Sequence, residues 1–382
     1  MSTSLNKLAP ITGAAVAFLC ALLLVWQPVH AAEPFKSSVP AALLMDAATG
    51  EVIYELNSHN QYAPASMVKM MVALIVMEKL QEGGIRLEDP ITVSARASKI
   101  GGSQVYLKQG ETFTLEEMMK AVMIHSANDA ATAIAETVAG SVESFVDLMN
   151  LKAREIGMKD TVFHSVHGLP PGKGQEKDLT SAYDMALLGQ RLIRYPKVLE
   201  WSSIVNEPFR GREFPLCNTN KILTHYKGMD GLKTGYIRDS GFCITATAAR
   251  DGTRMIAVVM GAPTSTARTV ETTRLLTLGF NSYKTLSLAT GGQDLPKRLK
   301  VKGGKAPDVG LKYLSDLKVS VPASKAAEVV LTEELPEMME APLQQGQVVG
   351  KVTARLGDRV LGEVDVISSE ADEKASFWER LF

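Results

Sequence analysis

The feature that most constrains the fold is a nearly continuous apolar run from Met67 to Leu80. Almost every residue in it is Met, Val, Leu, Ile or Ala, and the pair Gly83-Gly84 ends it. A helix that is apolar on all sides belongs in a protein core, and this run is too short to cross a bilayer. We therefore expect a buried helix around which the rest of the chain packs.

One lysine, Lys69, interrupts this run near its start. A buried lysine is costly to keep charged and readily loses its proton. Ser66 lies three residues earlier, on the same helix face, and Pro64 suits a chain that enters a helix. A hydroxyl beside a deprotonatable amine at a helix N-terminus is an activated nucleophile. Taken alone, however, S-x-x-K is common by chance and favours an N-cap serine with a lysine that reaches solvent, so the activated nucleophile depends on the rest of the chain.

The bulk composition is that of an ordinary globular protein with two or three domains. The 382 residues include 46% hydrophobic and 22% charged residues, which are average proportions for a chain with sizeable cores. The formal net charge is -1. A nucleic-acid partner would require a basic face, so the charge gives it no support.

Residues 1–32 are predicted to be a secretory signal peptide. Lys7 is the only charged residue before Glu33, and an apolar core runs from about residue 11 to residue 26. The run Val29-His-Ala-Ala32 then offers a cleavage site of small residues. The alternative is an uncleaved anchor helix, but the core is short. We expect an exported protein whose fold begins at about Glu33.

Export makes the cysteines informative. Cys20 lies within the signal peptide, which leaves Cys217 and Cys243 in an oxidising compartment. They could form a disulfide if their strands are neighbours, but the sequence does not supply that geometry. A disulfide and two free thiols therefore both remain open.

Residues 33–284 are predicted to form an antiparallel sheet flanked by a helical cluster. The expected strands are 42–45, 51–56, 229–237, 241–249 and 255–260; the expected helices are 67–80, 115–124, 129–138, 142–156, one that begins at Ser181 and ends before Pro196, and 269–278. Because neighbouring strands are joined by short turns, we expect an α+β layer arrangement.

Residues 285–368 have a different pattern, with Gly-Gly pairs and four stretches that alternate apolar and polar residues. These stretches are 317–321, 328–332, 348–356 and 359–367. Such alternation is typical of a small all-β domain. No stretch gathers a nucleophile, a base or metal ligands, so we expect a spacer or docking module.

Two further clusters carry polar side chains that suit a binding site. The run 125–129, HSAND, lies in a break between two helical patterns, and such a turn can direct Ser126 and Asn128 inward. The run 231–236, GLKTGY, places a cation, a hydroxyl and a glycine in succession at 233–235, which suits an anionic ligand. Each cluster alone is also consistent with an ordinary turn or an edge-strand lysine.

Together, S-x-x-K at 66–69, S-x-N at 126–128 and K-T-G at 233–235 resemble the penicillin-binding proteins and serine β-lactamases. From about residue 40 to residue 283 the chain is most similar to the low-molecular-mass D-alanyl-D-alanine carboxypeptidases, the class represented by penicillin-binding protein 5. The supporting runs are YAPASMVK (62–69), GGSQVYLKQGE (101–111), VMIHSANDA (122–130), VHGL (166–169), DGLKTG (230–235) and AVVMG (257–261). The resemblance implies a β-lactamase-like transpeptidase domain followed by the β-rich second domain of that family.

The resemblance also implies a serine peptidase that releases the terminal D-alanine from peptidoglycan stem peptides. Ser66 would attack the D-Ala-D-Ala bond, and neutral Lys69 would take its proton. Ser126, assisted by Lys233, would relay the proton to the leaving D-alanine, and the amide of Asn128 would bind the substrate backbone. No cofactor or metal is implied.

The remaining residues of the implied site bind the substrate or stabilise charge. Thr234 and Arg268 would hold the terminal carboxylate, for which a guanidinium is well shaped. The backbone N–H groups of Ser66 and Tyr236 would form an oxyanion hole, with Gly235 leaving the backbone open to close approach. β-Lactam antibiotics would acylate Ser66 and leave slowly.

The chain departs from the family pattern at two positions. Ala127 stands where glycine is frequent, and Tyr236 stands where histidine often follows K-T-G, so the backbone N–H is kept but no imidazole is present. His164 and His167 lie near acidic residues, but they lack a metal-ligand spacing. We expect a structural loop there.

Residues 369–382 are expected to form a membrane-attaching tail. Phe377, Trp378, Leu381 and Phe382 would share one face of a helix from Glu373, which suits shallow burial in a bilayer surface. Acidic residues outnumber basic ones in this segment, so a tail that docks on protein or frays is the alternative. The resemblance favours a periplasmic enzyme held on the outer face of the cytoplasmic membrane.

Three other functions fit the same scaffold. A D,D-endopeptidase would cut cross-links. A β-lactamase, even a slow one, would share the acyl-enzyme but release it faster than a carboxypeptidase releases penicillin, although no convincing Glu-x-x-x-Asn run lies between Ser126 and Lys233. The third is a non-catalytic wall-binding protein, which would not need Ser66, Lys69, Ser126 and Lys233 all intact.

Overall fold

A computed structural model describes residue 35 and residues 37–376. The predicted signal peptide and the apolar face of the predicted tail lie outside the described residues. Among the described residues, no helix combines the length and apolar character needed to cross a membrane.

The central element is a five-stranded antiparallel sheet with the strand order β2-β1-β9-β8-β7. Its strands are β1 (Ala41–Asp46), β2 (Val52–Leu56), β7 (Met229–Ile237), β8 (Gly241–Arg250) and β9 (Thr253–Ala262). Leu43 pairs with Val258, which joins the N-terminal hairpin to the later meander. All five predicted strands are confirmed within one or two residues.

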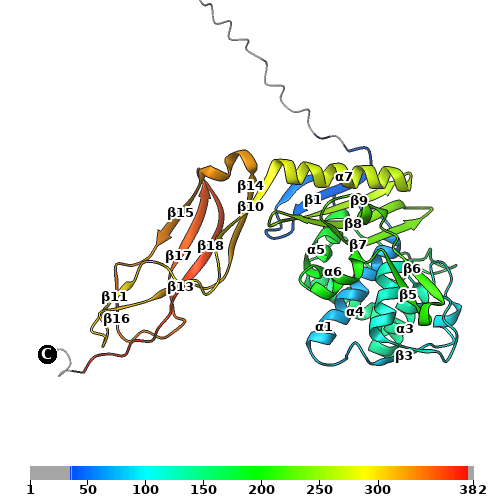
Figure 1. The fold of residues 1–382 in the computed structure, drawn as a ribbon, viewed down its shortest axis with the longest axis horizontal. Helices are drawn as coiled ribbons and strands as arrows, with labels where there is room; N and C mark the ends of the chain where they lie inside the picture. The colour runs from blue at the N-terminus through cyan, green and yellow to red at the C-terminus, as the bar shows by residue number, and fades with distance from the viewer. Residues whose placement is uncertain (1–34, 36, 377–382) are drawn as a thin grey trace, which may run out of the picture. The chain divides into compact units, whose positions relative to one another are not determined.

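Helices cover both faces of this sheet. In Figure 1, α7 (Ser265–Ser282) runs along one face and the helical cluster lies on the other. The cluster contains α1 (Lys69–Gln81), α2 (Leu115–Lys120), α3 (Asn128–Ala139), α4 (Val142–Glu155), α5 (Ala182–Leu192) and α6 (Pro196–Ser203). Two short antiparallel strand pairs accompany it, β3 (Pro90–Thr92) with β4 (Thr112–Thr114) and β5 (Asn206–Phe209) with β6 (Phe214–Cys217). Helix α1 is buried at every position from Lys69 to Met77, as its apolar sequence predicts.

Helix α7 extends four residues beyond each end of the expected helix 269–278, and three other helical segments differ from the sequence expectation. The run 67–80 begins as a 3₁₀ turn, η1 (Ala65–Val68), before α1, and the helix expected at 115–124 divides into α2 and a π-helical turn, η3 (Ala121–His125). Helix α6 was not predicted, because Pro196 was interpreted only as a terminator. Proline instead opens α6, since the first helical position needs no backbone donor.

The C-terminal β-region, residues 283–376, is all-β apart from one 3₁₀ turn, η6 (Ala323–Glu328), as predicted. Its strands are β10 (Tyr283–Ala289), β11 (Leu299–Lys302), β12 (Asp308–Val309), β13 (Leu311–Tyr313), β14 (Leu317–Pro322), β15 (Val329–Glu334), β16 (Met338–Glu340), β17 (Val348–Leu356) and β18 (Arg359–Ser368). They form sheets in the orders β13-β18-β17-β15, β12-β11-β16 and β10-β14. Inward-facing residues such as Val352, Val364 and Val366 make a separate apolar core.

The tail was predicted to be helical from Glu373, and for the described residues of the tail this prediction is wrong. Residues 373–376 are not helical: Lys374 bridges to Gly304, and the backbone N–H of Lys305 donates to the carbonyl of Glu373.

The sequence left open whether Cys217 and Cys243 form a disulfide. In the structure both thiols are free, the first exposed and the second buried.

Candidate active site

Two close backbone approaches position Ser66. A Cβ at Gly168 would lie 2.0 Å from the carbonyl oxygen of Ala65, and a Cβ at Gly235 would lie 2.5 Å from that of Pro64. Only glycine allows such contacts without displacing the backbone. The loop at 166–169 and strand β7 therefore close on the turn that carries Ser66.

Lys69 is completely buried and lies beside Ser66. Its Nζ is 3.1 Å from Ser66 Oγ, 2.6 Å from Asn128 Oδ1 and 2.9 Å from the carbonyl oxygen of His167. Burial and, secondly, the nearby charge of Lys233 hold the Lys69 pKa well below its usual range, against an opposing pull from Asp129 and Asp178. The sequence prediction of a desolvated lysine beside the serine is confirmed.

The S-x-N turn brings Ser126 and Asn128 into the interior. Ser126 is left-handed, with φ 67°, where η3 ends, and Asn128 begins α3. The Asn128 amide donates to the carbonyl of Gly101 at 2.7 Å while its oxygen accepts from Lys69. The Oγ of Ser126 is buried and has no hydrogen-bond partner among the described residues. An unpartnered buried hydroxyl is costly and is available to a ligand.

The segment that holds Asn128 is itself anchored by a buried carboxylate. The N–H groups of Val105 and Leu107 both donate to Asp129, at 3.1 Å. The N–H of Asn128 in turn donates to the carbonyl of Ser103 at 2.7 Å. Asp129 therefore connects the loop before β4 to the start of α3, which fixes the direction of the Asn128 side chain.

Strand β7 supplies the second buried lysine. Lys233 is 1% exposed, and its Nζ donates to the carbonyl of Thr234 at 3.1 Å. Burial, followed by the charge of Arg268, lowers the Lys233 pKa to about 7. The hydroxyl of Thr234 donates to the hydroxyl of Thr219 at 2.7 Å. Lys233 is thus poised between its charged and neutral forms near neutral pH.

Arg268 approaches this strand from α7. Only 5% of the residue is exposed, and burial lowers its pKa. Its Nη2 donates to Ser265 at 3.3 Å, but its Nε has no partner among the described residues. Its guanidinium lies 5.9 Å from the ring of Phe242, on which the exposed Tyr236 ring stacks at 4.2 Å. A buried guanidinium with an unused donor suits a carboxylate ligand.

Sequence reasoning missed the contribution of the loop that contains His167. The carbonyl of His167 accepts from Lys69, while its ring accepts from the N–H of Leu169 at 3.2 Å. Burial and the neighbouring Lys69 lower the His167 pKa to about 4, so the ring is neutral. Asp178 fixes the loop by accepting from the N–H and hydroxyl of Ser165. Any residue type can supply a backbone carbonyl, so the sequence does not indicate this contact. The only signal for this loop was the VHGL run at 166–169.

The motifs expected from the sequence therefore lie around one centre. Lys69 contacts Ser66 and Asn128 directly, and the charge of Lys233 acts on Lys69. No group of metal-ligating side chains occurs among residues 37–376. The chemistry that this arrangement supports is attack by a serine hydroxyl activated by a neutral amine.

Comparisons with known proteins agree with this geometry. A family model described as D-alanyl-D-alanine carboxypeptidase matches residues 28–264, and one described as penicillin-binding protein 5, C-terminal domain, matches residues 283–374. The chain is 37% identical to the D-alanyl-D-alanine carboxypeptidase DacF of Bacillus subtilis over 341 residues, which covers 88% of this chain and 86% of that protein. It is 33% identical to DacC of Escherichia coli over 90% of this chain and 86% of the relative.

Solved structures give the same result. Penicillin-binding protein 5 of Haemophilus influenzae superposes with a TM-score of 0.78 and 30% identity, over 89% of this chain and 99% of that one. Penicillin-binding protein D2 of Listeria monocytogenes, solved in an ampicillin-bound form, covers 65% of this chain and 99% of its own, with a TM-score of 0.59 and 30% identity. The chain belongs to the D-alanyl-D-alanine carboxypeptidase family.

Proposed function

We propose that this serine-type D-Ala-D-Ala carboxypeptidase removes the terminal D-alanine of peptidoglycan stem peptides through an acyl-enzyme on Ser66. The observation that carries the proposal is the set of contacts around Lys69. A neutral amine has two N–H donors and one lone pair. The carbonyl oxygens of Asn128 and His167 match the two donors, which leaves the lone pair for the proton of Ser66.

Acylation follows from that geometry. Lys69 accepts the proton of Ser66 as the hydroxyl oxygen attacks the carbonyl of the D-Ala-D-Ala peptide bond. The backbone N–H groups of Ser66 and Tyr236 stabilise the oxyanion, and one such donor is typically worth about 3–4 kcal/mol. Because Gly235 lies against Pro64, these two N–H groups belong to segments that are packed together.

The leaving D-alanine needs a proton and a binding site. Ser126, whose hydroxyl has no partner among the described residues, passes the proton that Lys69 took from Ser66 on to the leaving amine, with help from Lys233. Thr234 and the unused donor of Arg268 hold the terminal carboxylate. Asn128 has one amide hydrogen left for the substrate backbone, since the other binds Gly101. Water then hydrolyses the acyl-enzyme.

β-Lactams are covalent inhibitors in this scheme. The chain interacts with peptidoglycan and with β-lactams as a member of its family, and the ampicillin-bound Listeria protein shares its fold. In the proposed mechanism the β-lactam carbonyl acylates Ser66 as the ring opens, and water hydrolyses the resulting ester only slowly.

The family acts on the cell wall and is exported. We propose domains at 33–284 and 285–368 after a cleaved signal peptide at 1–32. We further propose that residues 369–382 attach the periplasmic enzyme peripherally to the cytoplasmic membrane. Removing residues 369–382 should then move the enzyme from washed membranes to the soluble fraction. An unchanged distribution would contradict this attachment.

The activity is tested with a peptide that ends in D-Ala-D-Ala. Wild-type enzyme should release free D-alanine, and Ser66→Ala should release none. Absence of D-alanine with wild-type enzyme would favour a non-catalytic wall-binding protein. Release of labelled penicillin within seconds would favour a β-lactamase, and cleavage of purified cross-linked muropeptides would add endopeptidase action.

A further inference from the structure

Strand β15 forms an open edge of the four-stranded sheet in the C-terminal β-region. The order β13-β18-β17-β15 leaves one side of β15 without a neighbouring strand among the described residues, and Figure 1 shows β15 at the margin of this sheet, beside β17. Five of its six residues are exposed, and only Val329 is half-buried. An open edge presents a row of backbone donors and acceptors that can pair with an added strand.

This edge lacks the features that usually prevent strand addition. β15 contains no proline and no lysine, and its register with β17 runs without a bulge from Val329, opposite Leu356, to Glu334, opposite Lys351. The strand at the other end of the same sheet, β13, has only three residues. Prolines, lysines, bulges and short edge strands all oppose pairing with another chain. Within this sheet, β15 is therefore the edge that is open to an added strand.

The first half of the edge is apolar. Val330 is 60% exposed and Leu331 is 38% exposed. Leu331 lies opposite the fully buried Ala354, so it extends the core face of the sheet to the open edge. Val330 lies opposite Arg355 and extends the other face, because successive side chains of a strand alternate between faces. An added strand with apolar residues at this position buries apolar area on both faces.

The second half of the edge and the residues on either side of β15 are acidic. The segment 328–337 contains no lysine or arginine and four exposed glutamates: Glu328, Glu333, Glu334 and Glu337. Within residues 37–376 only Glu334 forms an ion pair, at 4.0 Å from Lys351, and that lysine lies closer to Glu363, at 3.3 Å. A basic strand gains ion pairs here, whereas a second copy of this edge brings four more glutamates.

We propose that β15 is a docking edge for an extended, partly basic segment of another protein. The half of the segment opposite Val330 and Leu331 is apolar. The half opposite Glu333 and Glu334 carries lysine or arginine. The backbone of the segment adds a fifth strand next to β15, so the apolar half supplies buried area and the acidic half selects the partner by charge.

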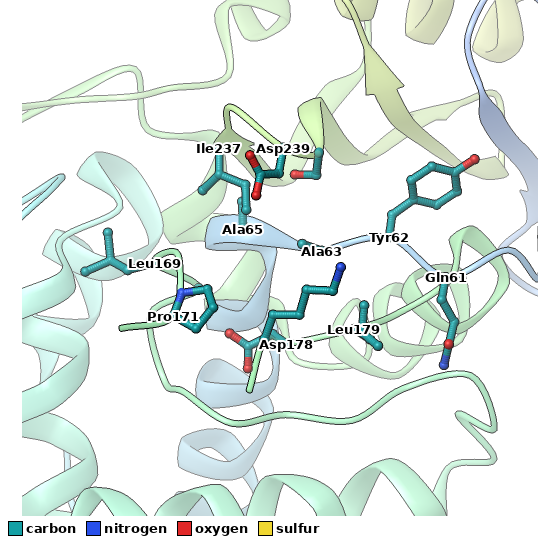
Figure 2. Close-up of a pocket in the computed structure, with 13 residues that line it drawn as sticks. Gln61, Tyr62, Ala63, Ala65, Leu169, Pro171, Asp178, Leu179, Ile237 and Asp239 are labelled. Atoms are coloured by element: carbon teal, nitrogen blue, oxygen red, sulfur yellow. The ribbon is translucent and has the colours of Figure 1, made fainter. Parts of the chain in front are cut away.

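The docking edge is distinct from the catalytic centre. β15 shares no residue with the pocket that Ala65, Leu169 and Asp239 help to line, which is drawn in Figure 2. None of the residues placed in catalysis or substrate binding belongs to the C-terminal β-region. Docking at β15 therefore does not depend on the proposed carboxypeptidase function, and Ser66→Ala should bind the same partner.

Two fluorescein-labelled peptides test the edge with the full mature chain. The basic peptide, Ser-Lys-Lys-Thr-Val-Ile-Thr-Ser, places its lysines opposite Glu334 and Glu333 when it runs antiparallel to β15, and the acidic peptide has glutamates in place of the lysines. Fluorescence anisotropy should show that the basic peptide binds at least about tenfold more tightly, because two exposed charge pairs change from attractive to repulsive. Hydrogen exchange of the backbone amides of residues 329–334 should slow when the basic peptide is bound.

Two controls separate strand addition from general attraction between charges. Glu333→Lys combined with Glu334→Lys should reverse the preference, so that the acidic peptide binds more tightly. The same change of net charge at exposed positions outside β15, Asp294→Lys combined with Glu340→Lys, should leave the basic peptide preferred. N-methylation of alternate amides removes the donors from one edge of the peptide, so one of the two methylated basic peptides should fail to bind.

The same measurements can overturn the proposal. No binding of the basic peptide, equal affinity for the two peptides, or an unchanged preference in the doubly substituted β15 would show that this edge does not select a basic strand. Binding of both methylated peptides would show that backbone pairing is not involved. Exchange of residues 329–334 that slows when the wild-type chain alone is concentrated would assign the edge to a second copy instead.

Discussion

The two regions of the chain treat ionisable residues in opposite ways. Within the described residues, the sheet-and-helix region buries Asp46, Lys69, Asp129, Asp178, Asp184, Lys233, Arg268 and Glu271, whereas the C-terminal β-region buries only Asp372. Burying a charge is costly unless it is neutralised or fully hydrogen-bonded. Within the sheet-and-helix region, Lys69, Lys233 and Arg268 bear this cost around Ser66.

The buried groups of the sheet-and-helix region themselves fall into two sets. Asp129 and Asp178 accept backbone N–H groups and hold loops in place. Lys69 and Lys233 form no ion pair among the described residues, and burial is the largest cause of the lowered pKa of each. Perturbed groups of this kind are typical of functional sites. The two sets therefore differ in role: the two carboxylates hold loops in place, whereas burial of the two amines favours their neutral forms beside the nucleophile.

The largest expected effect comes from removing the amine next to the nucleophile. Lys69→Met should lower the rate of acylation by labelled penicillin at least about 10³-fold, because the hydroxyl of Ser66 loses its base. Lys302→Met, at an exposed position in the C-terminal β-region, is the matched control. A rate for Lys69→Met within tenfold of wild type would show that Lys69 is not the base.

A smaller loss is expected when the backbone beside the nucleophile is displaced. Gly168→Ala would place its Cβ 2.0 Å from the carbonyl oxygen of Ala65, at φ +75°, so Ala65 and Ser66 must shift. A displacement of this kind should lower acylation about 10²-fold. Gly174→Ala is the matched control, because its φ is +78° and nothing lies within 4 Å. If Gly174→Ala lowers the acylation rate as much as Gly168→Ala does, the cause is the positive φ itself and not a displacement of Ser66.

Arg268 should affect both substrate binding and the pH profile. Arg268→Gln should lower kcat/KM for a D-Ala-D-Ala peptide about 10- to 100-fold, because a charge-assisted contact with the carboxylate is lost. It also removes a positive charge that lowers the Lys233 pKa, which is about 7 in the intact protein. That pKa should rise, so the alkaline limb of kcat/KM, where Lys233 loses its proton, should move to higher pH. Arg298→Gln should leave the limb in place, and a downward shift for Arg268→Gln would contradict this account.

The smallest effect is expected for a surface ion pair in the C-terminal β-region. Lys351 lies 3.3 Å from Glu363, and the two side chains are 41% and 44% exposed. Lys351→Gln should therefore change the free energy of unfolding by less than about 1 kcal/mol and leave acylation unaltered. Denaturant unfolding and labelled penicillin provide the two measurements. A decrease of several kcal/mol in the free energy of unfolding would show that exposed ion pairs in this region contribute substantially to stability.

The fold was predictable where one pattern dominates. The apolar run of α1 and the alternation in β14, β15, β17 and β18 determine buried faces, so their positions were predicted to within a few residues. Pro196 misled because proline can either end or open a helix, and the π-helical turn at 121–125 has no sequence signature. The boundaries at 284 and 368 remain predictions.

The site was predictable as far as its side chains form motifs. Lys69, Ser126 and Lys233 belong to ordered patterns, and the structure buries all three. The carbonyl of His167 and the close approach at Gly168 involve backbone atoms, which any residue could supply in principle.

The most direct test of the central claim is mass spectrometry of the protein after treatment with penicillin. We predict a single penicilloyl adduct per chain, located on the peptide that contains Ser66, with no adduct on Ser66→Ala and a strongly slowed one on Lys69→Met. An adduct on another residue, or an undiminished adduct on Ser66→Ala, would contradict the assignment of Ser66 as the nucleophile.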